Sequence, residues 1–147
     1  MNLIYGKLPE SFNVLPKLRH FDMSSTALSG SLPESFNVLP ELRHFDISSN
    51  ALSGSLPGFA DSILSLQQLD LSNQTNGFTG SIPEDLWRFQ SLRILNLAGN
   101  KLTGTIPPTI GDMAVLEEFD LSNNRLVNAI PSELGQLAGE FIVCYLF

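Results

Sequence analysis

Residues 42–57 read LRHFDISSNALSGSLP. Leu42, Phe45 and Ile47 occupy the apolar positions of an L-x-x-L-x-L spacing, and Asn50 follows three residues later. Side chains alternate between the two faces of a strand, so Phe45 and Ile47 point to one side and Asp46 between them points to the other. The stretch therefore predicts a short strand that is apolar on one face and is followed by a turn at Asn50.

The same stretch recurs along the chain. A proline ends each copy, at intervals of 24 residues with a single interval of 26: Pro9, Pro33, Pro57, Pro83, Pro107 and Pro131. A glycine precedes each proline by three residues, except that Asn128 takes this place in the last copy. Gly, and after it Asn, most readily adopts positive φ. This fixed period predicts a stack of similar structural units.

We expect a single domain over residues 1–147. It divides into a partial repeat at 2–17, full repeats at 18–41, 42–65, 66–91, 92–115 and 116–139, and a terminal segment at 140–147. In the terminal segment, Glu140 stands where the repeat requires leucine. The segment either covers the last repeat as one more strand or leaves an open hydrophobic edge, and the sequence allows both.

Each repeat has the same expected order of strand, turn, second extended piece and helical turn. The inward strand positions hold Phe21/Met23, Phe45/Ile47, Leu69/Leu71, Leu95/Leu97 and Phe119/Leu121. Apolar pairs three residues apart predict the helical or 3₁₀ turn that closes a repeat: Phe36/Leu39, Leu86/Phe89, Ile110/Met113 and Leu134/Leu137. Trp87 lies in such a turn, and we expect it to be partly exposed on the back of the repeat.

A column of asparagines marks the turns. It comprises Asn50, Asn76, Asn100 and Asn124, with Gln74 as the alternative to Asn76 and with Thr26 in the first full repeat. An inward Asn can pair backbone groups of the turn, which avoids a desolvation cost of about 1–3 kcal/mol per unpaired group. We expect this column to be structural.

Composition and charge bound the possible partners. The 147 residues carry a net charge of −7, which disfavours nucleic acid and anionic membrane surfaces as partners. No apolar run reaches the roughly 20 residues of a membrane span, and the first residues lack the features of a signal peptide. Cys144 is the only cysteine, which suits either a reducing compartment or a fragment of a longer protein.

Motifs of catalysis are not found. The sequence has no G-x-S-x-G, H-E-x-x-H, phosphate-binding loop or dinucleotide glycine pattern, so we expect neither enzyme activity nor a cofactor. His20/Asp22 and His44/Asp46 have the residue types of a divalent metal site. Tandem duplication of 8–32 as 32–56 produces the same pattern, and no metal site is assigned.

Repeat 66–91 contains two additional residues and the sequon Asn73-Gln74-Thr75. Asn-x-Ser/Thr is the acceptor sequence for N-glycosylation in secreted proteins. One interpretation is a glycan at Asn73, and the other is a chance match in a turn rich in Ser and Asn. In either case we expect the insertion to bulge beside the strand surface.

Residues 92–113, LRILNLAGNKLTGTIPPTIGDM, resemble the plant-specific class of leucine-rich repeats. This class occurs in plant receptor-like kinases, receptor-like proteins and polygalacturonase-inhibiting proteins. The resemblance covers nearly the whole chain. It implies an α/β repeat fold, namely a right-handed leucine-rich-repeat solenoid with a concave parallel β-sheet and short 3₁₀ or helical turns on the convex side. It also implies extracellular or cell-surface recognition of peptides, proteins or carbohydrates.

The outward strand residues are the candidate ligand-binding surface. In parallel strands they form columns about 4.8 Å apart. The candidates are Arg19, His20, Asp22, Arg43, His44, Asp46, Gln68, Asp70, Arg93, Asn96, Glu118 and Asp120. The alternative for the aspartates is that Asp is the default residue of the repeat and carries no information about a ligand.

The function favoured by these features is non-catalytic recognition of a protein or peptide on the concave sheet. By resemblance, the module would belong to a plant receptor-like kinase or receptor-like protein in signalling or defence, with a co-receptor as a further partner. Two alternatives stay open. One is an inhibitor of polygalacturonase-type enzymes, and the other is a structural or co-receptor scaffold that self-associates through uncapped ends.

Overall fold

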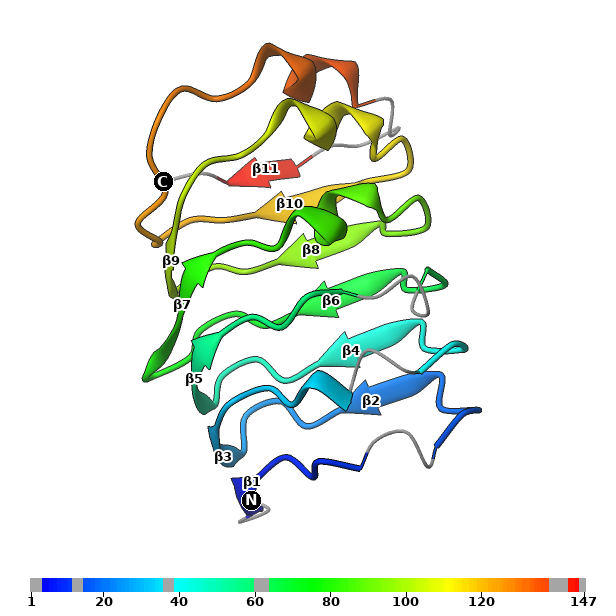
Figure 1. Cartoon of the computed structure of the whole chain (residues 1–147), viewed down its shortest axis with the longest axis vertical. Helices are drawn as coiled ribbons and strands as arrows, with labels where there is room; N and C mark the ends of the chain where they lie inside the picture. Colours follow the sequence, from blue (N-terminus) through cyan, green and yellow to red (C-terminus); the bar gives the residue numbers. More distant parts are fainter. Residues whose placement is uncertain (1–3, 12–14, 36–38, 60–63, 138–142, 146–147) are drawn as a thin grey trace.

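The computed structural model describes residues 4–11, 15–35, 39–59 and 64–137, and the backbone of 143–145. The chain forms a solenoid whose coils are stacked along the long axis of the molecule, with the N-terminal coil at one end (Figure 1). The strands form two parallel sheets, one of six strands and one of five, and the four coils 18–41, 42–65, 66–91 and 92–115 contribute one strand to each. The predicted repeat architecture is therefore confirmed.

The first sheet contains the strands predicted from the L-x-x-L-x-L spacing. They are β2 (His20–Asp22), β4 (His44–Asp46), β6 (Gln68–Asp70), β8 (Ile94–Asn96), β10 (Glu118–Asp120) and β11 (Val143–Tyr145). Phe45, Leu69, Leu95 and Phe119 pair in register across this sheet and have no exposed surface. Phe21, at the N-terminal end of the stack, is half-buried.

β11 resolves the two alternatives for the end of the chain in favour of an additional strand. It pairs in parallel with β10, and Cys144 lies opposite Phe119. This register adds one residue to the interval between β10 and β11, compared with that between β8 and β10. The shift explains why Glu140 does not match a leucine position. Glu140 itself lies outside the described residues.

The second sheet is built from the extended piece after each turn. Its strands are β1 (Tyr5–Lys7), β3 (Ala27–Gly30), β5 (Ala51–Ser55), β7 (Gly77–Ser81) and β9 (Lys101–Thr103). The recurring glycines adopt the predicted positive φ, for example 88° at Gly54 and 87° at Gly104, and Asn128 has φ 72°. A Cβ on Gly104 would lie 3.3 Å from Cβ of Ser81. The glycine column thus also allows neighbouring coils to approach closely.

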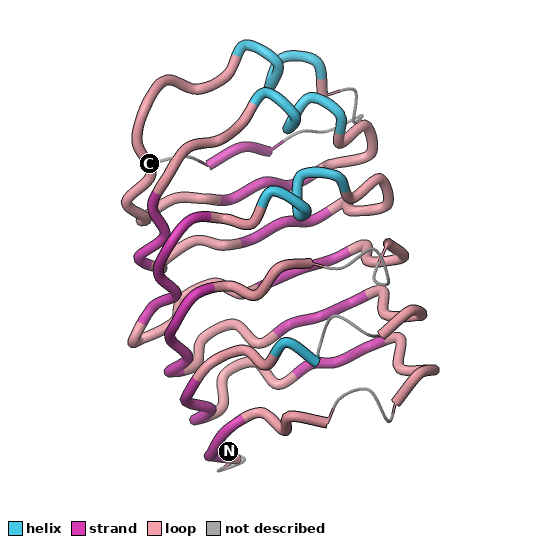
Figure 2. The backbone as a smooth tube through the Cα atoms, in the orientation of Figure 1, coloured by secondary structure: helices cyan, strands magenta, loops and turns pink. Residues whose placement is uncertain are grey.

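Short 3₁₀ helices close the later coils, opposite the first sheet (Figure 2). They are η4 (Glu84–Arg88), η5 (Pro108–Asp112) and η6 (Ser132–Gln136), and each follows a proline. The prediction of 3₁₀ turns is confirmed for these coils, whereas Phe36 lies outside the described residues. No helix in the described part of the chain has the length and hydropathy needed to cross a membrane.

The predicted exposure of Trp87 is wrong. Its side chain is only 1% exposed, and its ring meets Phe119 edge to face with 6.3 Å between centroids. The indole extends from η4 into the interior of the solenoid, where it reaches a side chain of β10. Burial of this large ring removes apolar surface from water and packs the helical turn against the first sheet.

The asparagine column forms with one correction. The members of the column are Asn50, Gln74, Asn100 and Asn124. In each, the side-chain NH₂ donates to backbone carbonyls of the same coil and of the preceding coil, and the side-chain oxygen accepts a backbone N–H. Gln74 rather than Asn76 takes this place in the third coil. The two additional residues follow Gln74, so Asn76 lies beyond the turn, where it is exposed and donates to the carbonyl of Ala51.

Candidate functional site: the concave sheet surface

The strands of the first sheet bring the predicted ligand-binding residues into straight columns. Strand pairing places His20, His44, Gln68, Ile94 and Glu118 opposite one another. The same pairing aligns Asp22, Asp46, Asp70, Asn96 and Asp120. Alternation along each strand directs both columns away from the core, and their side chains are half-buried or exposed. We call this surface the concave face.

Two histidines form a stacked pair at the N-terminal end of the concave face. The rings of His20 and His44 are nearly parallel, with an interplanar angle of 8° and centroids 4.3 Å apart. Beneath them, Phe21 and Phe45 stack in the same way. Burial lowers the pKa of His44, and the neighbouring charges of His20 and Arg43 lower that pKa further. Among the described residues, Nδ1 of His44 has no hydrogen-bond partner.

The aspartate column also has a structural role. In each coil an oxygen of the Asp or Asn side chain accepts the backbone N–H two residues later, as Asp46 does from Ser48 at 2.9 Å. These bonds fix the turn that leads to a residue with positive φ, such as Ser49. The second carboxylate oxygen takes no part in these bonds, and that of Asp70 accepts from the side-chain amide of Asn96 at 3.2 Å. The column thus shapes the turns whether or not it contacts a ligand.

Local environment gives individual aspartates different pKa values. Burial raises the pKa of Asp70, although hydrogen bonds from Ser72 and Asn96 oppose the shift. At the exposed end of the column, the backbone N–H of Ser24 is the main cause of a lowered pKa at Asp22. Asp22 therefore keeps its negative charge to a lower pH than Asp70 does.

The arginines at the edge of the concave face differ in their partners. Arg19 forms an ion pair with Glu41 at 2.8 Å, and Arg93 forms one with Glu117. Arg43 has no ion pair among the residues that the structure describes. Sequence reasoning did not identify Glu41 as a partner, although Lys17 occupies the equivalent place in the duplicated segment. The change from Lys17 in one copy to Glu41 in the other was the sequence signal for the ion pair with Arg19.

The sequon lies in the turn beside the concave face. Asn73 is exposed, has φ 55°, and donates its backbone N–H to the carbonyl of Ala98. Thr75 and Asn76 are exposed next to it. The additional residues are hydrogen-bonded to the preceding coil, since Thr75 donates its backbone N–H to the carbonyl of Asn50 and Asn76 donates its side-chain amide to that of Ala51.

The histidine–aspartate pairs do not assemble a metal centre. In the described ranges, no three His, Cys, Asp or Glu side chains are grouped so that they could hold a metal ion. Stacking directs the two imidazole rings face to face rather than toward a common point.

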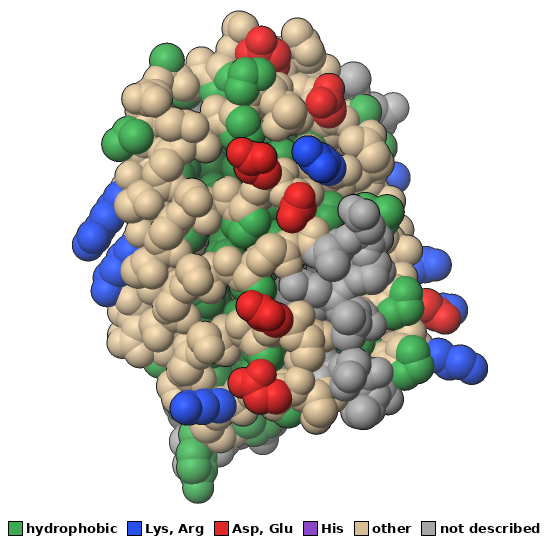
Figure 3. Space-filling model, viewed as in Figure 1, with side chains coloured by type: hydrophobic (Ala, Val, Ile, Leu, Met, Phe, Trp, Pro, Cys, Tyr) green, Lys and Arg blue, Asp and Glu red, His purple; other side chains and the backbone are tan. Residues whose placement is uncertain are grey.

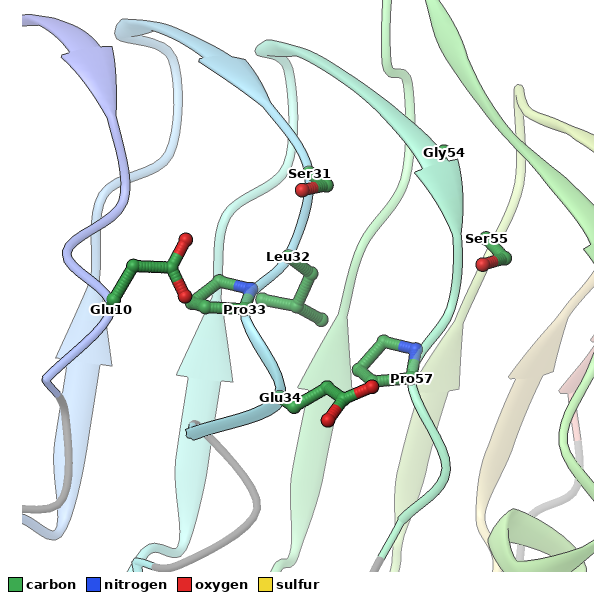
Figure 4. Close-up of a pocket in the computed structure, with 8 residues that line it drawn as sticks. All are labelled: Glu10, Ser31, Leu32, Pro33, Glu34, Gly54, Ser55 and Pro57. Carbon is green, nitrogen blue, oxygen red and sulfur yellow. The ribbon is translucent and has the colours of Figure 1, made fainter.

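A groove away from the concave face was not anticipated from the sequence. It has a volume of about 360 Å³ and is lined by residues of neighbouring coils: Glu10, Ser31, Leu32, Pro33, Glu34, Gly54, Ser55 and Pro57. The Glu10 carboxylate extends toward Pro33, and that of Glu34 toward Pro57 (Figure 4). The face viewed in Figure 3 carries a row of acidic side chains beside a broad area without charge.

Comparisons with known proteins agree with this architecture. A family model described as Leucine Rich Repeat matches residues 17–39, 41–62, 65–89, 91–113 and 115–137. No curated protein matches the chain. Among solved structures, the plant peptide hormone receptor RGFR1 in complex with RGF2 is 34% identical with a TM-score of 0.90, and the match covers 97% of this chain and 23% of that receptor chain.

Two further structures show the range of similar proteins. The Arabidopsis receptor kinase HAESA, in complex with the peptide hormone IDA and the co-receptor SERK1, is 32% identical with a TM-score of 0.86; the match covers 94% of this chain and 23% of that one. A plant ice-binding protein is 31% identical with a TM-score of 0.83, over 92% of this chain and 45% of that one. The chain thus spans about a quarter of the length of the receptors. It belongs to the leucine-rich-repeat family and has the fold of plant receptor-kinase ectodomains.

Proposed function

We propose that the chain is a non-catalytic recognition module that binds a peptide or protein on its concave face, outside the cell or at its surface. The observation that carries this proposal is the set of aligned, solvent-facing polar columns on a parallel sheet. Such a surface is prearranged, so a ligand does not have to order it on binding. Similar receptors are seen in complex with peptide hormones and, for HAESA, with a co-receptor, which supports a peptide ligand and a co-receptor as partners.

Peptides selected from a phage-displayed random library against the chain test this proposal. We expect them to shift backbone amide NMR signals of β4, β6, β8 and β10. The double variant His44→Ala, Glu118→Lys should weaken their binding by about tenfold or more, because it removes one side chain of the surface and reverses the charge of another. Glu84→Lys on η4 is the control and should leave binding unchanged. The proposal would be contradicted if the selected peptides bound the double variant as tightly as the unsubstituted chain.

We propose ice binding as a second candidate function, on a different surface. The outward positions of the second sheet carry hydroxyls in four consecutive coils: Ser29, Ser31, Ser53, Ser55, Thr79, Ser81, Thr103 and Thr105. Strand pairing sets Ser55 opposite Thr79 and Ser81 opposite Thr103. The coils repeat at about 4.8 Å, which gives a regular array of hydroxyls suited to a repeating lattice of water, and Lys101 lies opposite Thr79 at its edge. The similarity to a plant ice-binding protein supports this candidate.

An ice-recrystallisation assay distinguishes the two functions. If the second sheet binds ice, the chain should keep ice grains small, and Ser55→Lys with Thr79→Lys should abolish this effect. His44→Ala with Glu118→Lys should not alter it. Unrestricted grain growth with the unsubstituted chain would eliminate the second candidate.

We further propose that Asn73 carries an N-linked glycan when the protein passes through a secretory pathway. The exposed position of Asn73 and of Thr75 supports this proposal. Expression in a plant secretory system should add a mass that glycosidase removes and that Asn73→Gln abolishes. An unchanged mass in the unsubstituted, secreted protein would contradict it.

A further inference from the structure

A strip across the concave face runs from positive to negative. In the middle of the face, His44, Gln68, Ile94 and Glu118 lie opposite one another on β4, β6, β8 and β10. We call these four residues the central strip, and all four are half-buried. Arg43 precedes His44 at the start of β4 and is exposed. A cation therefore stands at one end of the strip, neutral side chains lie in its middle, and a carboxylate stands at the other end.

The charges at the two ends of the strip differ from those beside them. Arg19 and Arg93 each form an ion pair with a glutamate, Glu41 and Glu117 respectively. In the described part of the chain, the side chains of Arg43 and Glu118 have no ion pair. Asp120 lies beside Glu118 on β10 as Asp46 lies beside His44 on β4, and each accepts the backbone N–H two residues later. The aspartate column is therefore common to both ends, and the charges that distinguish the ends are those of Arg43 and Glu118. Both ends of the strip are thus available to a partner of opposite charge.

The separation of the two ends fixes the size of a matching ligand. Three strand spacings separate β4 from β10, which amounts to about 14 Å. An extended peptide advances about 3.3 Å per residue, so this distance corresponds to roughly four residues. Ile94 lies between the ends as an apolar contact, one strand from Glu118. The strip therefore matches an extended segment whose opposite charges are about four residues apart.

We propose that the central strip binds an extended peptide in one orientation, with an acidic side chain at Arg43 and His44 and a basic side chain at Glu118. This proposal rests on the proposed recognition function and adds the chemistry and the direction of the ligand. Complementary charges at the ends of an interface set register and reject mismatched partners more than they add affinity. The orientation depends on the position of the charges in the peptide and not on its chain direction.

Paramagnetic broadening measures this orientation directly. The probe is the capped peptide acetyl-EGSLK-amide, with a nitroxide attached at either end, together with its reversed sequence. A label at the glutamate end should broaden the amide signal of His44, and a label at the lysine end should broaden that of Glu118. The reversed sequence should give the same assignment of charge to strand. Raised salt should weaken both effects.

A charge-swapped variant provides the decisive comparison. Arg43→Glu with Glu118→Lys keeps the net charge and should exchange the two broadened sites. The matched control, Lys101→Glu with Asp112→Lys, makes the same exchange away from the concave face and should leave the orientation unchanged. Three results would each overturn the inference. The two labels could broaden both sites equally, the charge-swapped variant could fail to exchange the broadened sites, or the peptide could give no saturable shift at its highest soluble concentration. If phage-selected peptides still bind the concave face in that case, the proposed function survives without the fixed orientation.

Discussion

At the residue scale, polar side chains inside the solenoid act through specific backbone partners. Asn100 is 8% exposed; it donates to the carbonyls of Leu71 and Leu97 and accepts the N–H of Phe78. The asparagine pattern in the sequence predicted this role. It did not distinguish Gln74 from Asn76, because the position of a two-residue insertion relative to a turn depends on how the chain closes that turn.

Asn100→Leu should therefore destabilise the protein. The substitution leaves the buried N–H of Phe78 without its acceptor, and each such orphaned group costs about 1–3 kcal/mol. Asn76→Leu, at an exposed site with one hydrogen bond, should cost less than about 1 kcal/mol. Urea unfolding followed by circular dichroism measures both, and equal losses would contradict the assignment of the column.

His44 should make stability depend on pH in the weakly acidic range. Its pKa in the folded state is lowered from 6.5 by burial and by the charges of His20 and Arg43. The unfolded chain then binds more protons than the folded chain as pH falls through 6.5, so stability decreases toward acid. We expect the midpoint of urea unfolding to fall between pH 7 and pH 5, and His44→Gln to flatten this part of the profile. A steeper decline in the variant would show that another group is responsible.

At the element scale, the predictable features were those set by local periodicity. Strand positions and positive-φ glycines followed from the repeat spacing, because alternation and backbone freedom are properties of the residue and its neighbours in sequence. The burial of Trp87 and the pairing of Arg19 with Glu41 were missed. Both depend on how far one coil is displaced over the next, which the sequence of a single coil does not specify.

The glycine column yields a prediction for the second sheet. Gly104→Ala should cost about 1–2 kcal/mol, because φ is 87° there and the new Cβ would press on Ser81. Gly135→Ala is the control, since Gly135 is not among the positive-φ residues and no atom lies within 4 Å of its added Cβ. Thermal unfolding should show a lower midpoint for the first variant only. A similar midpoint for both would show that the column is not conformationally required.

At the scale of the whole molecule, the stack buries a continuous apolar interior but leaves apolar side chains at its N-terminal end. Ile4, Tyr5 and Leu15 are exposed by 41%, 81% and 46%. Solenoids generally need a polar outer face on their terminal units for solubility. We therefore predict that this end associates with a second copy of the chain.

Self-association should consequently depend on the N-terminal coil. Sedimentation velocity should show mass increasing with concentration, and the triple variant Ile4→Lys, Tyr5→Lys, Leu15→Lys should remain monomeric. Val127→Lys with Ile130→Lys, at exposed positions of the last coil, tests whether the opposite end takes part. A monomer at all concentrations would contradict association through the ends.

The proposed recognition surface depends most on the register of the first sheet, which puts one set of side chains inside and the alternate set on the concave face. Solvent paramagnetic relaxation of isoleucine methyl groups by a soluble gadolinium chelate tests this register. Ile94 lies on the concave face and should relax strongly, whereas Ile47 and Ile110 are fully buried and should relax weakly. Strong relaxation of Ile47 together with protection of Ile94 would invert the sheet and remove the proposed recognition surface.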